Sequence, residues 1–414
     1  MRPQNTIRQR QSQTLFTSRL SLGRKHRPDY SVLVLSVALL VVGLVLVYAL
    51  GPALGASKHV SNSFFLNRQM IAIGLSIVAF LFAAKVPLEW WRQAYKPLLG
   101  IAIIATLIAL LMPVNPAYPA HRWVRLGSFS FQSVELVKFA VMVWLAGFLA
   151  ESISRNQIHN FKLSQQPVII ALGVIAVVVA GVQSDLGSFG VIALMALAML
   201  LVAGVSFKKV FIFGLIGLII ASIFVLSTPY RRSRIETFIN PSAKCQTTGY
   251  QACQALITVG SGGIAGLGLG GSVQAYGYLP EAANDSIFAI YAEKFGLIGS
   301  WLLLGLFVWL FSKIKLIAEL STDNFTRLLV VGVLAWLSVQ SAINIGAMLG
   351  LAPLKGITLP FISYGGTSVV FIALAMGLVF QASQYTSFSL GKENNNSRRG
   401  SAMRNQQLNR EVIR

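Results

Sequence analysis

The chain has 414 residues, of which 55% are hydrophobic and only 11% are charged. Soluble domains carry roughly 25% charged residues, so this composition excludes an ordinary water-soluble protein and predicts an all-α polytopic membrane protein. The net charge of +21 does not indicate a nucleic-acid partner, because basic tails beside membrane spans more often face the cytoplasm and anionic lipid.

Both ends of the chain are basic and lack apolar periodicity. Residues 1–30 hold seven Lys or Arg residues, and residues 386–414 hold six. We therefore expect two disordered cytoplasmic tails around a transmembrane domain at 31–385. The first apolar run has full span length and no Ala-x-Ala-like exit, so it is expected to remain as an anchor.

Ten apolar runs come near the ~20 residues that a helix needs to cross a bilayer. The fifth and sixth are separated only by "SDLGS", which predicts a tight hairpin or a broken helix. Ten spans put both termini on one side, and the excess of Lys and Arg makes that side cytoplasmic. The runs lie at about 31–50, 69–86, 97–113, 134–151, 167–183, 189–206, 209–228, 287–312, 328–350 and 367–385.

Three segments interrupt the apolar pattern on the outer face, at 114–133, 229–286 and 351–366. The second is long, and its glycines are dense between Gly260 and Gly277. Such a stretch lets the backbone approach a ligand closely or fold into re-entrant turns. Function is therefore expected at the outer face.

Ionisable residues near the spans are candidates because an unpaired charge at mid-bilayer is costly. Glu135 and Lys138 lie on one helix face, either as a charged pair lining a polar cavity or as an ion pair marking the helix end. Asp185 is interpreted mainly as a structural N-cap of the sixth span, and it can also shape the cavity.

A cluster of arginines follows the seventh span directly and runs against the charge bias. Arg231, Arg232 and Arg234 either bind a lipid-linked phosphate or extend toward headgroups. Arg122, beside the interfacial Trp123, raises the same alternatives.

Asp285 precedes the eighth span, with Glu281 four residues before it. By residue type it is a helix cap. Its place beside a glycine-rich loop, on the same face as the arginines, favours a general base whose pKa is raised by desolvation.

No nucleotide or metal signature is present in the sequence. The run "GSGGIAGLGLGG" follows no strand and opens no βαβ unit, so it is no dinucleotide site. Cys245 and Cys253 either form a loop-closing disulfide or remain two independent thiols.

Six motifs in chain order resemble the SEDS family (shape, elongation, division and sporulation) over about residues 30–385. They are "HRWVRLGSFSFQSVELVK", "QSDLGSFG", "YRRSRIETFINP", "GYQACQAL", "GLGLGGSVQAYGYLPEAANDSIFAIYAEKFG" and "PLKGITLPFISYGGTS". The fifth and sixth look more like the division-type (FtsW-like) members than the elongation-type members. The resemblance implies a peptidoglycan glycosyltransferase that polymerises lipid II.

The resemblance also implies roles for individual residues. Asp285 matches the family's essential aspartate. Matches among the substrate contacts are Arg122, Glu135, Lys138, Glu281, Lys355 and Ser363. Asp285 would take the proton of the acceptor's 4-hydroxyl, and Arg122, Lys138, Arg231, Arg232 and Arg234 are candidates to stabilise the pyrophosphate leaving group.

Partners and cofactors follow from the same resemblance. It implies a class B penicillin-binding protein (a single-span transpeptidase), other division proteins and a divalent cation, Mg²⁺ or Mn²⁺, with no ligand cluster evident. The alternatives are a flippase or transporter for the lipid-linked precursor, an elongation-type polymerase, and a catalytically silent scaffold for division partners.

Overall fold

The computed structural model describes residues 26–112, 122–126, 129–227, 229–241 and 245–386. It does not describe the side chains of Arg125, Leu126, Phe129, Pro229, Tyr230 and Arg231. The basic tails therefore lie almost wholly outside the described residues, and their predicted disorder stays a prediction.

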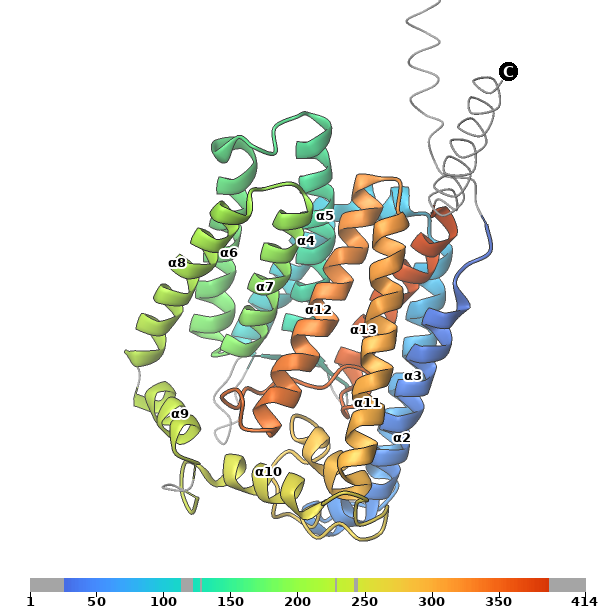
Figure 1. Ribbon diagram of the computed structural model, residues 1–414, viewed down its shortest axis with the longest axis vertical. Coiled ribbons are helices and arrows are strands. Elements are labelled where there is room, and N and C mark those ends of the chain that lie inside the picture. Colours follow the sequence, from blue (N-terminus) through green and yellow to red (C-terminus); the bar gives the residue numbers. More distant parts are fainter. Residues whose placement is uncertain (1–25, 113–121, 127–128, 228, 242–244, 387–414) are drawn as a thin grey trace, which may run out of the picture.

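The described part is built of helices, with one short β-hairpin (Figure 1). Nine helical segments within it are long and apolar enough to cross a membrane, and α7 is a further apolar helix of 17 residues. In order, these segments match the ten predicted spans. They are α2 (Tyr30–Lys58), α3 (Phe64–Lys85), α4 (Leu88–Leu111), α5 (Ser133–Ser154), the continuous run η1 (Phe161–Gln165), α6 (Gln166–Ile175) and η2 (Ala176–Val182), α7 (Leu186–Val202), α8 (Phe207–Leu226), α11 (Ile287–Leu320), α12 (Asn324–Met348), and α13 (Gly366–Ala382) with η4 (Ser383–Tyr385).

Three of the helices extend well past the predicted span ends. Helix α2 continues through Pro52 to Lys58, α11 continues to Leu320, and α4 begins at Leu88, before the predicted start at 97. The prediction followed apolar residues, which end near the lipid boundary, whereas the backbone hydrogen bonds of a helix can continue into the polar layer. Span number and order were thus predictable, but the helix ends were not.

The two ends of the described chain meet on the same side of the bundle. The backbone N–H of His26 donates to the carbonyl oxygen of Gln384 at 3.0 Å, just before α2 and just after α13. Helices α9 (Pro229–Ile239) and α10 (Tyr250–Ser261) lie at the opposite end (Figure 1). The long segment between α8 and α11 therefore lies opposite the chain ends, as ten spans predict.

Helices α5 and α12 form the centre of the bundle. In the most apolar 18-residue stretch of each of these two helices, 72% is buried, compared with 11% in α8. Helix α8 exposes a row of large apolar side chains, which suits a lipid-facing helix. Close packing elsewhere uses small residues: a Cβ on Gly377 of α13 would lie 2.5 Å from the carbonyl oxygen of Phe80 in α3.

The glycine-rich loop after α10 packs against the first turns of α11. A Cβ on Gly262 would lie 2.1 Å from the carbonyl oxygen of Ala292, and a Cβ on Gly266 would lie 2.3 Å from that of Lys294. The carboxylate of Glu293 accepts hydrogen bonds from Ser272 and from the backbone N–H of Val273. The close backbone approach that the glycines predict is therefore made to the chain's own helix.

Candidate active site

Asp285 lies immediately before α11, at the end opposite the chain termini. The N-cap residue of α11 is Ser286, and among the described residues neither a backbone N–H nor a side chain donates a hydrogen bond to the Asp285 carboxylate. The cap interpretation of Asp285 is therefore wrong. A half-buried carboxylate without a partner has a desolvation cost that a structural role would not explain.

The surroundings of Asp285 raise its pKa from 3.8 to about 7. Desolvation is the largest cause, and the negative charges of Glu281 and Asp185 add to it. The positive charges of Arg122 and Arg234 act in the opposite direction without cancelling it. A carboxylate with a pKa near neutral exchanges protons readily at physiological pH, which is the property required of a general base.

Arg122 is held beside this carboxylate by backbone oxygens. It precedes the hairpin of β1 (Trp123–Leu126) and β2 (Phe129–Gln132). Its Nε donates to the carbonyl oxygen of Gln183 at 2.9 Å and its Nη2 to that of Ser184 at 2.6 Å. The side chain is thus fixed in orientation by two of its nitrogens.

The third nitrogen of Arg122 and the carboxylate of Asp285 face the same glycine. A Cβ on Gly356 would lie 3.2 Å from Asp285 Oδ2 and 3.6 Å from Arg122 Nη1. Cation and carboxylate thus approach each other across a residue that has no side chain.

Hydrogen bonds join the loop that carries Asp285 to the loop between α12 and α13. Ser363 Oγ accepts from the N–H of Leu359 and donates to the carbonyl oxygen of Asn284, both at 2.7 Å. The N–H of Tyr364 donates to the carbonyl oxygen of Ala283 at 2.8 Å. The outer segments predicted from the sequence, as far as they are described, therefore meet at one place, and Ser363 holds the loop.

Glu281 begins the turn that carries Asp285. Its φ of 50° is left-handed, and its carboxylate accepts from the side-chain amide of Asn284. Its side chain is exposed at the end of the bundle opposite the chain termini, close enough to raise the pKa of Asp285.

Asp185 is the predicted N-cap of α7, and the structure confirms it. Its carboxylate accepts from the N–H of Ser188 at 3.0 Å and from the hydroxyl of the same residue at 2.9 Å. The candidate Lys355 lies beside this cap. A Cβ added to Gly187, two residues after Asp185, would lie 2.9 Å from Lys355 Cβ. Asp185 therefore caps its helix and also adds negative charge near Asp285.

The predicted arginine cluster divides into separate roles. Arg234 Nη1 donates to the carbonyl oxygen of Leu354 at 3.2 Å, and its charge reaches Asp285. Arg232 is exposed and pairs with Glu236 at 3.3 Å on the same helix, so its charge is already engaged. The side chain of Arg231 lies outside the described residues.

Glu135 and Lys138 form an ion pair of 2.8 Å inside the bundle, with 4% and 1% of their side chains exposed. Lys138 Nζ also donates to Gln340 Oε1 at 2.8 Å and lies over the ring of Trp336. Both side chains are therefore buried and paired within the described structure, and a contact of either one with the substrate stays a prediction.

Two residues of α12, which the sequence interpretation missed, bond to the loops around Asp285. Gln340 Nε2 donates to the carbonyl oxygen of Thr358 at 2.9 Å, and Asn344 Nδ2 donates to those of Asp285 at 2.8 Å and Ile357 at 2.7 Å. The two amides are four residues apart in an apolar helix, which puts them on one face. That spacing was the available signal.

Cys245 and Cys253 form a disulfide at the start of α10. This decides between the two alternatives that the sequence left open. The bond ties the segment before α10 to the helix itself.

A divalent cation has no ready-made protein site in the described ranges. Those residues contain no group of three or more His, Cys, Asp or Glu side chains that could hold a metal ion. Mg²⁺ is commonly held by one or two carboxylates together with substrate phosphates. Asp285 supplies one such carboxylate, so the donor set fits a cation only when a substrate adds oxygens.

Comparison with known proteins gives a family for the whole described bundle. The family model for the FtsW, RodA and SpoVE cell cycle proteins matches residues 30–388. Stage V sporulation protein E of Bacillus subtilis is 35% identical over 368 residues, which cover 88% of this chain and 99% of that protein. The probable peptidoglycan glycosyltransferase FtsW of Coxiella burnetii is 36% identical over 365 residues, 86% of this chain and 96% of that protein.

Solved structures share the fold. A chain of a peptidoglycan synthase complex aligns with a TM-score of 0.68 and 24% identity, over 86% of this chain and 97% of that one. The rod shape determining protein RodA of Thermus thermophilus aligns with a TM-score of 0.61 and 21% identity, over 87% and 98% of the two chains. This protein is a multi-pass membrane protein of the FtsW/RodA/SpoVE (SEDS) family.

Proposed function

We propose that this protein polymerises lipid II into glycan strands at the outer face of the cytoplasmic membrane during cell division, with Asp285 as the general base. The coarser part of the proposal rests on family membership: the chain is a peptidoglycan glycosyltransferase, the activity after which several relatives are named. The division role, the base and the orientation, with both termini cytoplasmic, are the finer proposal.

The observation that carries the assignment of the base is the Asp285 carboxylate, which has no hydrogen-bond partner among the described residues and whose pKa is raised to about 7. In the reaction, the proton of the acceptor's 4-hydroxyl passes to Asp285 and the hydroxyl oxygen forms a bond to the anomeric carbon of the donor. The bond from that carbon to the phosphate oxygen breaks, and undecaprenyl pyrophosphate leaves.

Positive charge near Asp285 suits the departing pyrophosphate. Arg122, Arg234 and Lys355 lie around the site, and the first two act on the charge of Asp285. Preorganised cations that face a developing negative charge lower the barrier of such a step. A bound divalent cation would add Lewis-acid stabilisation of the same oxygens, with Asp285 as the carboxylate available to hold it.

A class B penicillin-binding protein is the proposed partner. The resemblance implies it, and a structural relative comes from a complex that coordinates polymerization and crosslinking. Co-purification of the two full chains from a membrane extract tests this part, together with other division proteins.

The test of the activity is glycan synthesis from purified lipid II by the purified protein, with chain length measured on a gel. Asp285→Asn keeps the shape of the side chain and is expected to reduce polymer at least a thousandfold while thermal stability is retained. Asp323→Asn at the opposite end is the matched control, because Asn can keep the N-cap hydrogen bond from the N–H of Thr326. Normal polymer from Asp285→Asn contradicts the assigned base, and lipid II translocation without polymer supports a flippase.

A further inference from the structure

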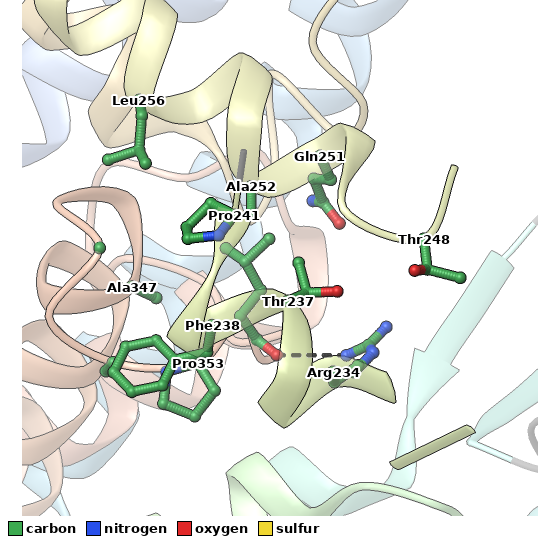
Figure 2. A pocket seen from close by; sticks show the side chains of 13 residues that line it. Arg234, Thr237, Phe238, Pro241, Thr248, Gln251, Ala252, Leu256, Ala347 and Pro353 are labelled. Carbon is green, nitrogen blue, oxygen red and sulfur yellow. Dashed lines mark hydrogen bonds between the residues drawn. The ribbon is translucent and has the colours of Figure 1, made fainter. Parts of the chain in front are cut away.

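A small cavity lies at the outer face between α9, α10 and the loop after α12 (Figure 2). Its volume is about 70 Å³. Polar side chains (Arg234, Thr237 and Gln251) lie toward one side of it in Figure 2, and apolar ones (Phe238, Leu256 and Ala347) lie toward the other. The cavity therefore offers a polar wall and an apolar wall to one small group.

The hydroxyl of Thr237 lacks a hydrogen-bond partner. Thr237 is only 5% exposed, and its buried Oγ1 has no bonded neighbour among the described residues. An unpaired buried hydroxyl is destabilising, so such groups are uncommon in folded proteins. A ligand that supplies the missing partner explains why this one is retained beside a cavity.

The cavity adjoins the proposed catalytic loop through two of its polar residues. Gln251 Nε2 donates to Ser286 Oγ at 3.3 Å, and Ser286 follows Asp285 directly. Arg234, which lines the cavity, is one of the two cations whose charge lowers the pKa of Asp285. A group bound here would belong to a sugar whose ring lies near the reacting carboxylate.

We propose that this cavity binds the 2-acetamido group of a substrate sugar. The methyl group would contact Phe238, Leu256 and Ala347, and the carbonyl oxygen would accept from Thr237 Oγ1. The side-chain nitrogen of Gln251 already donates to Ser286, so the side-chain oxygen of Gln251 would accept a hydrogen bond from the acetamido N–H. The inference rests on the proposed function, because both sugars of lipid II carry acetamido groups.

The size of the cavity is tested with lipid II in which N-propanoyl replaces N-acetyl. One added methylene changes kcat/KM by about 10–200-fold in a pocket that fits its ligand. We therefore expect the purified protein to use the N-propanoyl substrate at least tenfold less efficiently than lipid II. Ala347→Gly, which lengthens the apolar end, should recover most of that loss.

The orphan hydroxyl is tested with Thr237→Val, which keeps the shape of the side chain. We expect kcat/KM for lipid II to fall about tenfold, whereas the melting temperature should not fall, because no existing hydrogen bond is removed. Thr106→Val is the matched control, since its buried hydroxyl bonds only to the carbonyl oxygen of Ala102 in its own helix. It should leave kcat/KM unchanged.

Analogues that serve in one role only identify which sugar occupies the cavity. A lipid-linked disaccharide with a blocked 4-hydroxyl reports on the donor, and one without pyrophosphate reports on the acceptor. Equal use of acetyl and propanoyl substrates in both roles, or an unchanged kcat/KM for Thr237→Val, overturns the cavity assignment while leaving the polymerase proposal intact. A protein that polymerises neither substrate contradicts the polymerase proposal itself.

Discussion

The side-chain amide of Asn344 donates a hydrogen bond of 2.8 Å to the main-chain carbonyl oxygen of Asp285. The same nitrogen also donates to the carbonyl oxygen of Ile357 at 2.7 Å, so one amide of α12 holds the loop that carries Asp285 and the loop between α12 and α13 together. Because Gly356 precedes Ile357, this amide fixes the place where Asp285 and Arg122 approach each other. The site is thus positioned from the bundle core.

Asn344→Leu removes both hydrogen bonds and keeps the volume of the side chain. We expect kcat to fall about 10–100-fold with little change in KM, because a displacement of about 1 Å can cost a hundredfold. Gln381→Leu is the matched control: its amide is also buried with an unpaired oxygen, but it lies near the other end of α13. Equal losses in the two variants would point to general destabilisation instead.

The pH profile should report the ionisation of Asp285. A general base works only when deprotonated, so kcat/KM should rise with pH, about tenfold per pH unit well below the midpoint, and level off above a midpoint of about 7. Glu281→Gln removes a negative charge that raises this pKa, so the midpoint should move to lower pH. A flat profile between pH 5 and 9 would argue against Asp285 as the base.

Gly356→Ala tests the contact between carboxylate and guanidinium. The new methyl group would lie 3.2 Å from Asp285 Oδ2, so the carboxylate must move by a few tenths of an ångström. We expect a loss of roughly tenfold in kcat. Gly305→Ala on α11, where a Cβ meets nothing within 4 Å, should keep full activity. Full activity of Gly356→Ala would show that this approach has no catalytic importance.

The sequence predicted the number and order of the spans, because each apolar run is near the bilayer thickness. It also predicted the Asp185 cap, which depends on residues within one turn. It gave two alternatives for Asp285, because a cap and a base have the same local pattern. Only the tertiary contacts that bring Asp185, Arg122 and Arg234 near it distinguish them.

The positioning residues were harder to predict than the charged ones. The prediction considered ionisable groups and selected Lys138, whose charge is paired with Glu135 inside the bundle. It did not consider the neutral side-chain amides of Gln340 and Asn344, which bond to the loops around Asp285. Gly356 carries no side chain at all, so its importance depends entirely on what approaches it. Such roles follow from packing between segments far apart in the chain.

Removal of divalent cations should separate catalysis from folding. The described residues hold no three-ligand cluster, so a cation would depend on oxygens of the substrate. EDTA is therefore expected to abolish polymerisation without lowering the melting temperature of the substrate-free protein. Mg²⁺ or Mn²⁺ should restore activity, and the cation concentration needed should decrease as the concentration of lipid II increases. A melting temperature that falls in EDTA would indicate a resident structural metal.

A substitution that removes one partner of the buried pair of Glu135 and Lys138 should lower the free energy of unfolding more than replacement of both partners. Lys138→Met leaves the Glu135 carboxylate buried, with its Oε2 already unpaired, so we expect a loss of about 3–5 kcal/mol in the free energy of unfolding. The double variant with Glu135→Gln removes the uncompensated charge and should recover most of that loss.

Lys315→Met is the matched control for this cycle. Lys315 pairs with Glu319 at 3.6 Å, with 68% and 59% of the two side chains exposed, so its loss should cost no more than about 1 kcal/mol. Thermal unfolding in one detergent gives the order of the three variants. If Lys138→Met and the double variant unfold at the same temperature, the unpaired Glu135 charge is not the cause of the loss, which contradicts the expected cost of breaking the buried ion pair.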